Sequence, residues 1–278
     1  MMALAGLTFG CGDDDSTPGG AGSSSGSSTG APTTGTPTTT GVDSSTGVGS
    51  GSASESGESS SSTGPEVEVT VEGEVIDFVL SQSIPESEIS IYDDPSITAT
   101  ADDMGMFSIG TFTPNTGALF VLAPLETHWG AIIPVDIGSE PLQQDVELTQ
   151  ISTNIVDMQI MGLEGQDPVP AELERAIVIV RLLNNAAVME GDVTVEMDPA
   201  PDPGTFYAPD PGGAPILDQN LIQWSVIPVV VYFNVDDTDP GDISITATHP
   251  TRECTVLYPE LPTIGEHMTL FDVQCLAP

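Results

Sequence analysis

The chain has 278 residues, long enough for one or two domains, and carries 42 aspartates and glutamates against three arginines and no lysine, a formal net charge of −39. Such a surface repels phosphate groups, so the composition excludes nucleic-acid binding and electrostatic attachment to anionic lipid headgroups. The absence of lysine also excludes Schiff-base and phosphate-loop chemistry.

Residues 1–11 form the first segment. Met1 to Gly10 reads MMALAGLTFG, and Cys11 is followed by Gly12 and three aspartates. This segment resembles the end of a bacterial lipoprotein signal peptide, in which small and apolar residues precede a lipidated cysteine. The resemblance implies a lipid on Cys11 and an exported protein anchored to the bacterial outer membrane or cell surface. Because an export signal needs a positive segment, we expect one bearing Lys or Arg to precede Met1.

Residues 12–65 are a low-complexity run of Ser, Thr, Gly and Pro with scattered acidic residues. The run lacks the apolar side chains that would offset the entropy of ordering its backbone, which predicts a disordered linker. As a flexible chain it spans about 40 Å, so it would act as a stalk. Its Thr-Pro clusters could carry O-linked sugars.

Residues 66–150 read as a series of short strands. From Val67 to Val75 apolar and acidic residues alternate with a period of two. Turn signals rich in Asp, Pro, Asn and Gly separate the later segments. Roughly seven strands in this stretch predict an antiparallel β-sandwich. The other expected strands are Glu88 to Tyr92, Ile97 to Thr100, Met106 to Ile109, Ala118 to Ala123, Ala131 to Ile137 and Asp145 to Thr149.

Three segments of this region resemble the carboxypeptidase regulatory-like family. They are Gly73 to Asp77, Ile89 to Tyr92, and Thr100 to Ile109, where a glycine permits the turn and Phe107 enters the core. The resemblance implies a prealbumin-like (transthyretin-like) sandwich. Members of the family mostly act as appended modules without catalysis, so it also implies display or binding.

Residues 151–278 show a weaker version of the same pattern, which predicts a second, diverged sandwich. The expected fold class is therefore all-β, with two small antiparallel sandwiches, prealbumin-like or immunoglobulin-like, after the stalk. Pro199 to Pro215 reads as an exposed loop, and Pro170 to Arg175 as one helical turn. The expected strands are Arg175 to Leu183, Gly191 to Met197, Val229 to Val235 and Asp242 to Thr248.

The chain has three cysteines. Lipidation of Cys11 would leave Cys254 and Cys275 as a pair in an oxidising compartment, which predicts a disulfide. Such a bridge would contribute about 3 kcal/mol and hold Phe271 to Cys275 against Arg252 to Val256. The alternative is two free thiols or a metal site, although neither a CxxC motif nor a Cys-His cluster is present.

No constellation in the sequence predicts catalysis. His128, His249 and His267 are far apart and form no known metal motif, so each is interpreted as a surface or core-edge residue. The intradiol dioxygenases have a related sandwich and hold iron with tyrosines and a His-x-His pair. Because no such pair accompanies the four tyrosines, iron catalysis is not expected.

Two weaker hypotheses concern binding. Asp236, Asp237, Asp239 and Asp242 could gather oxygens around Ca²⁺, although a solvated acidic turn driven by Pro240-Gly241 is favoured. Trp129 and Trp224 could stack on sugars, although core positions are commoner for aromatic residues. No other cofactor is expected.

The sequence therefore predicts a non-catalytic, monomeric surface lipoprotein whose sandwiches serve adhesion, scaffolding or ligand binding. Its partners would be a membrane, through the lipid, and an extracellular protein or carbohydrate. The alternative is a carbohydrate- or substrate-binding accessory module for a secreted hydrolase.

Overall fold

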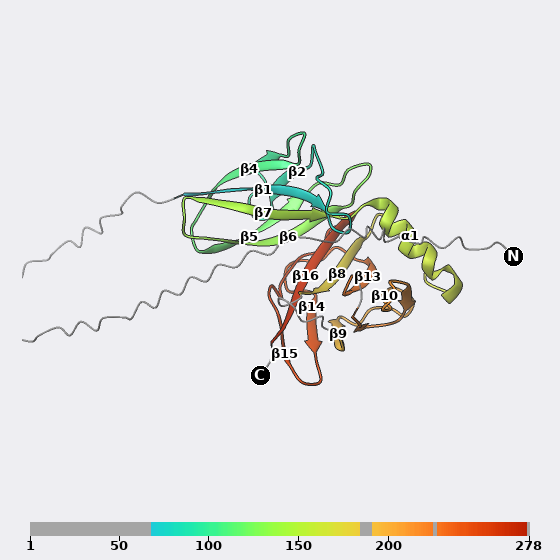
Figure 1. Ribbon diagram of the computed structural model, residues 1–278. Helices are drawn as coiled ribbons and strands as arrows, with labels where there is room; N and C mark the ends of the chain where they lie inside the picture. The colour runs from blue at the N-terminus through green and yellow to red at the C-terminus, as the bar shows by residue number, and fades with distance from the viewer. Residues whose placement is uncertain (1–67, 184–190, 225–226, 277–278) are drawn as a thin grey trace, which may run out of the picture. The chain divides into compact units, whose positions relative to one another are not determined.

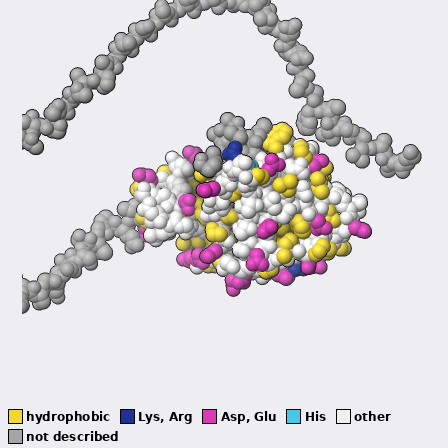
Figure 2. Space-filling model, turned by 90° about the horizontal axis from the view of Figure 1, so that it is seen from below, with side chains coloured by type: hydrophobic (Ala, Val, Ile, Leu, Met, Phe, Trp, Pro, Cys, Tyr) yellow, Lys and Arg dark blue, Asp and Glu magenta, His cyan; other side chains and the backbone are white. Residues whose placement is uncertain are grey.

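The computed structural model describes residues 68–183, 191–224 and 227–276, and these residues form an almost entirely β structure (Figure 1). The described residues belong to one compact unit. Cys11 and the stalk of residues 12–65 lie outside the described residues. Acidic side chains are spread over the visible face of the molecule, and Lys and Arg colour is scarce there (Figure 2).

The seven strands expected between residues 66 and 150 are all present and pack as two layers. In one layer β1 lies between β4 and β7 (Figure 1). In the other layer the order is β3-β2-β5-β6. The strands are β1 (Val69–Asp77), β2 (Glu88–Ile91), β3 (Thr98–Thr100), β4 (Met106–Phe112), β5 (Thr116–Leu122), β6 (Gly130–Ile137) and β7 (Leu142–Gln150).

Strand β1 shows how the sequence directs this sandwich. Its residues alternate strictly between buried and half-buried positions, as its period-two pattern predicts. At the β3–β4 turn Gly105 has φ +79°, and Phe107 is buried two residues later. Only glycine adopts such a φ at no steric cost, so this turn delivers the aromatic ring to the core.

The rest of the chain adds strands to β6 and a small separate sheet. The large sheet continues from β6 to β16, β8, β13, β10 and β11, with β15 beside β16. The small sheet has the order β12-β9-β14. These strands are β8 (Ala176–Leu182), β9 (Val193–Asp198), β10 (Phe206–Pro209), β11 (Pro215–Leu217), β12 (Leu221–Ile222), β13 (Val229–Val235), β14 (Ser244–Thr248), β15 (Glu253–Val256) and β16 (His267–Leu276).

Strands β8, β13 and β16 are apolar on both faces because both faces are covered. In β8, Ile177 and Ile179 join one hydrophobic cluster, while Val178 and Val180 join another. The first cluster also fills the sandwich of β1–β7 and lies under the helix α1 (Thr153–Leu163). Burying one such side chain stabilises the fold by about 1.5–3 kcal/mol. Strands that are buried on both faces have continuous apolar sequences, and these sequences therefore identify the centre of this unit.

Strand β16 joins the two expected sandwiches within one sheet. His267 to Thr269 pair in parallel with β6, and Met268 to Val273 pair in parallel with β8. Strands β1 and β7 are also parallel, and the other named pairs are antiparallel. The expected domain boundary between residues 150 and 151 stays a prediction. Strands from both sides of this boundary are hydrogen-bonded to each other in the large sheet.

Two expectations of local structure are wrong. The helix is α1, followed by the short 3-10 helix η1 (Glu164–Gln166), and not Pro170 to Arg175, which turns directly into β8. The stretch from Pro199 to Pro215 is not simply an exposed loop, because it contains β10, with Tyr207 and Ala208 buried. Pairing with β13 inside the large sheet overrides the turn-forming composition there. Neither helix of the described residues is long and apolar enough to cross a membrane.

Candidate functional site

A cavity of about 670 Å³ opens where β13 ends. Its wall is formed by the segment before β8, the segment that follows β9, the end of β13 and the acidic turn that precedes β14. Four carboxylates line it, from Glu172, Asp202, Asp236 and Asp242, and Arg175 is its single cationic residue. Its volume lies within the usual range of small-molecule sites, about 300–1,000 Å³.

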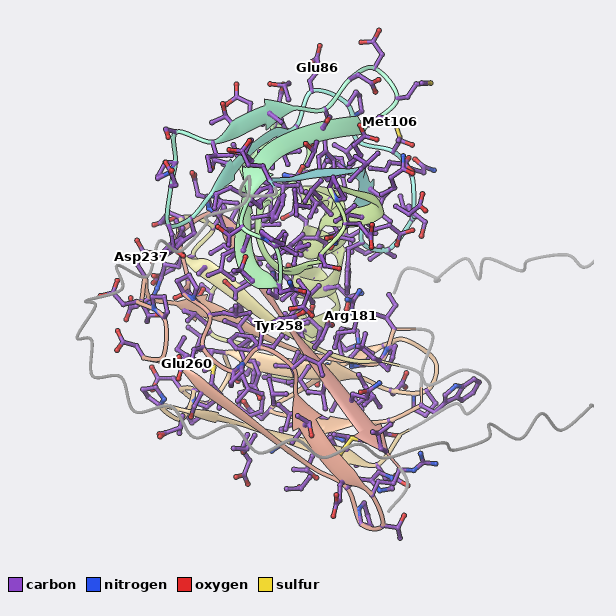
Figure 3. All side chains as sticks on the ribbon, turned by 90° about the vertical axis from the view of Figure 1, so that its left-hand side faces the viewer. Glu86, Met106, Arg181, Asp237, Tyr258 and Glu260 are labelled. Carbon is purple, nitrogen blue, oxygen red and sulfur yellow. A yellow bond between two sulfur atoms is a disulfide. The ribbon has the colours of Figure 1, made fainter. Side chains whose placement is uncertain are left out.

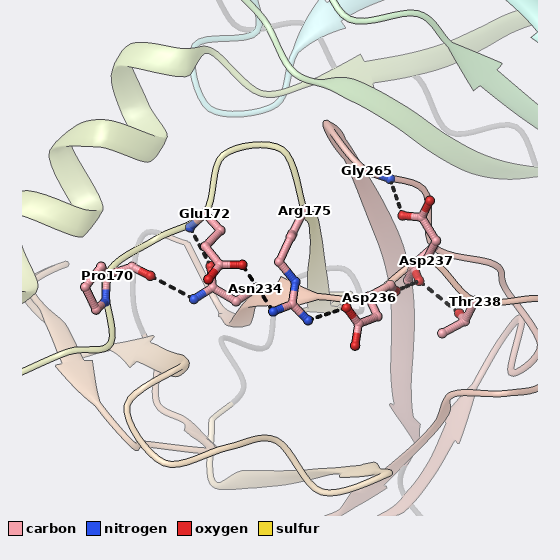
Figure 4. Close-up of polar contacts among 9 residues, drawn as sticks. Pro170, Glu172, Arg175, Asn234, Asp236, Asp237, Thr238 and Gly265 are labelled. Carbon is pink, nitrogen blue, oxygen red and sulfur yellow. Dashed lines mark hydrogen bonds and ion pairs between the residues drawn. The ribbon is translucent and has the colours of Figure 1, made fainter.

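Arg175 is held between two of these carboxylates (Figure 4). One terminal nitrogen lies 3.3 Å from Oε2 of Glu172, and the other lies 2.5 Å from Oδ1 of Asp236. The arginine side chain is 30% exposed, whereas that of Asp236 is 84% exposed, so solvent screens both pairs. Each pair therefore contributes about 0–1 kcal/mol to stability, and its main effect is to orient the guanidinium.

Asn234 fixes the segment that carries Glu172 (Figure 4). Its amide nitrogen donates to the carbonyl of Pro170 at 2.9 Å, and its Oδ1 accepts from the backbone N–H of Glu172 at 2.7 Å. The register of β13 against β8 shifts between Tyr232 and Val235, and Asn234 has φ +59°. Asparagine tolerates this left-handed conformation, which lets the strand bulge at the cavity.

The turn that follows β13 holds the four aspartates proposed for calcium. Asp236 is paired with Arg175, while Oδ1 of Asp237 accepts from the N–H of Gly265 at 2.7 Å (Figure 4). The N–H of Asp242 donates to the carbonyl of Asp239, and Gly241 has φ +89°, as in a turn with Pro at its second position.

These aspartates therefore point to separate partners. Among residues 68–183, 191–224 and 227–276, no three His, Cys, Asp or Glu side chains are grouped as metal ligands. A calcium site at the acidic turn stays a prediction without support from this arrangement. Asp237 lies with Glu260 along one side of the molecule (Figure 3).

Tyr232 lines the cavity from the central part of β13. The residue is 1% exposed, and its ring stacks on Phe206 with the centroids 5.7 Å apart. Its hydroxyl is buried and has no hydrogen-bond partner among the described residues. Burial, and secondarily the charge of Glu196, raises the pKa of Tyr232 well above its usual value, so the phenol is neutral.

The histidines lie apart from the cavity. Nε2 of His128 is 3.4 Å from Oδ2 of the buried Asp77, and Nδ1 of His249 accepts from the N–H of Thr251. Nδ1 of His267 is 2.7 Å from the carbonyl of Gly265. Each histidine thus has a local partner within the fold.

The other aromatic candidates divide between the core and the surface. Trp129 is 7% exposed and belongs to the first hydrophobic cluster, whereas Trp224 is 48% exposed. Tyr207 is buried, and burial raises its pKa. Tyr258 is half-buried, and burial, followed by a hydrogen bond to Asp136, raises its pKa to about 12.

The expected disulfide is confirmed. Cys254 on β15 and Cys275 on β16 are directly opposite in the strand pair, their Cα atoms are 4.0 Å apart, and their sulfurs are bonded. Cys275 is 1% exposed and lies in the second hydrophobic cluster. The bridge therefore ties the edge strand β15 to a central strand.

The sequence did not identify Arg175 or Tyr232 as site residues. They are 57 positions apart, and only the pairing of β8 with β13 brings their strands together. The available signal was the rarity of cationic residues, because one of only three arginines precedes an apolar run in a strongly acidic chain.

The sequence matches no family model and no curated protein. Among solved structures, "The Bacillus anthracis TIE protein" is 6% identical with a TM-score of 0.25, and the Streptococcal ancillary pilin is 11% identical with a TM-score of 0.25. The alignments cover 76% and 77% of this chain, but 34% and 64% of those chains.

The shaft pilin spaA from Lactobacillus rhamnosus GG is 9% identical with a TM-score of 0.24. That alignment covers 76% of this chain and 99% of the pilin. At such TM-scores these similarities support no inference about function. An inference about function therefore rests on the cavity and its residues.

Proposed function

We propose that this protein is an exported, non-catalytic binding module, anchored through a lipid on Cys11 and displayed at the bacterial surface for adhesion, scaffolding or ligand binding. The observation that carries the binding role is the 670 Å³ cavity, whose guanidinium is fixed between two carboxylates. Polar groups oriented in advance suit recognition of a ligand, because little order remains to be imposed when it binds.

Export is supported by the bonded pair Cys254 and Cys275, since disulfides persist in oxidising compartments. The acidic composition also suits a surface location, because salt outside the cell screens self-repulsion. The residues that would carry the lipid and the stalk lie outside the described part, so this half of the proposal rests on the sequence.

A second candidate is a carbohydrate- or substrate-binding accessory module serving a secreted hydrolase. The exposed Trp224 favours it, because an indole ring at the surface offers an apolar face on which a sugar ring can stack.

The experiment is intact mass spectrometry of the protein purified from the membrane fraction of its native cells. The proposal expects a species that begins at Cys11 and carries diacylglycerol and acyl mass. Its mass should also lack two hydrogens, lost when Cys254 and Cys275 bond. An unmodified chain that starts at Met1, or one in the soluble fraction only, would contradict surface anchoring.

A further inference from the structure

A second hollow space lies between the helix α1 and the large sheet, and we call it the α1 void. It has a volume of about 130 Å³ and is lined mainly by α1, β8, β10 and β13, by the residues that follow β1 and by the turn between β10 and β11. A smaller void of about 20 Å³ is lined further along α1 and shares four wall residues with it. The shared residues are Ile151, Ile179, Tyr207 and Val231.

The α1 void is large enough to hold a small molecule and is open to solvent. One water molecule needs about 10–15 Å³ of such space, and an apolar cavity of about 150 Å³ accepts a molecule of the size of benzene. Ile155 and Gln159 of α1 are half-buried at the wall, and Gly212 opposite them is exposed, so the void opens at the surface beside the helix. A ligand can therefore reach the wall from outside the fold.

The chemistry of the wall restricts that ligand. None of the described residues that line the α1 void is charged, although the chain carries 42 acidic residues among 278. The wall is mainly aliphatic, and its polar side chains are those of Gln159 and Tyr207. A charged ligand would lose its water there without gaining a counter-ion, which is costly, whereas an uncharged apolar ligand would lose little. A predominantly apolar lining with few polar groups is usual for small-molecule sites.

We propose that the α1 void binds a neutral amphiphile, with its short, unbranched alkyl chain between α1 and the sheet and its uncharged polar end beside Gln159. A linear chain fits the space better than a rigid ring system, because the smaller void continues from the same wall. The α1 void shares no lining residue with the cavity beside Arg175. It is therefore a second binding site, beyond the one on which the proposed function rests.

The test is titration of the full chain with 1-hexanol, followed by saturation-transfer difference NMR at moderate salt. Binding should be saturable, and 1-butanol should bind roughly tenfold more weakly, because two fewer methylene groups are buried. Hexanoate and hexylammonium have the same chain with a charged end, and neither should bind as tightly as 1-hexanol. Absence of saturable binding by 1-hexanol, or tighter binding of either ion, would overturn the proposal.

Two variants that fill the α1 void from opposite walls place the ligand. Val231→Met fills it from β13, and Ile155→Phe fills it from α1. Methionine adapts to irregular gaps, so urea unfolding of Val231→Met should keep the wild-type midpoint or move higher. Each variant should weaken binding of 1-hexanol at least tenfold, since the space for about two methylene groups is lost. The matched control is Val121→Met, at a half-buried position on β5 that lines neither void.

Wild-type affinity for 1-hexanol in both filled variants would overturn the assignment to this void, as would an equal loss of affinity in Val121→Met. Dimerisation of the free chain that 1-hexanol reverses would assign the void to a second copy and also overturn the proposal. These outcomes are independent of the mass measurement, since a chain without lipid that binds 1-hexanol contradicts only surface anchoring.

Discussion

Arg181 joins β8 to β16 by a two-pronged ion pair. Its Nε and one terminal nitrogen donate to the two oxygens of Asp272 at 2.7 and 2.9 Å, and its guanidinium lies 5.7 Å from the ring centre of Phe78. Figure 3 places Arg181 among the strands of the unit. The pair is largely shielded, with Asp272 only 18% exposed, so it contributes more than the exposed pairs of Arg175.

Arg181→Lys should therefore lower the free energy of unfolding by about 1–2 kcal/mol, because lysine keeps the charge but cannot bind both oxygens or stack on Phe78. Urea unfolding followed by circular dichroism measures the loss. Arg175→Lys is the matched control, with an expected loss below about 0.5 kcal/mol. Equal losses in the two variants would show that burial does not distinguish the pairs.

Single residues also show which part of the site was predictable. Cysteine count and compartment were enough to pair Cys254 with Cys275, because only two partners remained. Tyr232 carried no comparable signal, since a tyrosine within an apolar run is ordinarily a core residue. Its significance lies in the lack of a partner for its hydroxyl, which only three-dimensional packing determines.

At the level of strands, β7 passes close against Gly73 of β1. A Cβ atom added there would lie 1.8 Å from the backbone oxygen of Val146. The contact coincides with a register shift between Val71 and Gly73, where Asp145 on β7 has φ +62°. Neither backbone can withdraw without breaking the parallel pairing, so the position requires glycine.

Gly73→Ala should lower the free energy of unfolding by about 3 kcal/mol, since it overpacks a strand pair in which backbone must move. Gly117→Ala on β5 is the matched control, because a Cβ there meets nothing within 4 Å. The control should change stability by less than about 1 kcal/mol, and it could be stabilising. Thermal unfolding of both variants measures the difference in stability. If Gly73→Ala unfolds at the wild-type temperature, the close contact in the observed register of β1 and β7 is contradicted.

Elements were predictable where one physical pattern dominated. Alternation in β1 and β9, and apolar runs in β8 and β13, identify those strands directly. The helix α1 was missed because its buried residues, Val156 and Leu163, are spaced two turns apart among β-branched neighbours. The parallel pairings of β16 could not be predicted, because strand partners depend on tertiary packing and not on local sequence.

For the molecule as a whole, repulsion among the many acidic side chains is the interaction that we expect to depend most on salt. A net charge of −39 opposes compaction, and the Debye length falls from about 30 Å at 0.01 M salt to about 3 Å at 1 M. Raising NaCl from 0.02 to 0.5 M should therefore raise Tm by several degrees, since each kcal/mol shifts Tm by about 2–4 °C in a unit of this size.

Differential scanning calorimetry measures that shift, and KCl at the same ionic strength should reproduce it. An unchanged Tm would contradict the repulsion argument. A distinctly larger shift with CaCl₂ at matched ionic strength would support ion binding at the acidic turn from Asp236 to Asp242. The continuous sheet also leads us to expect one calorimetric transition for residues 68–276.

The central place of β16 has a consequence for the order of events during synthesis. This strand separates β6 from β8 in the sheet, yet it is made after every other strand described. Until His267 to Leu276 emerge from the ribosome, the facing edges of β6 and β8 have no strand between them, and Cys254 has no bonding partner on β16. The nascent chain therefore cannot complete this sheet until β16 has been synthesised, so the fold cannot be assembled strand by strand in the order in which the strands follow one another along the chain.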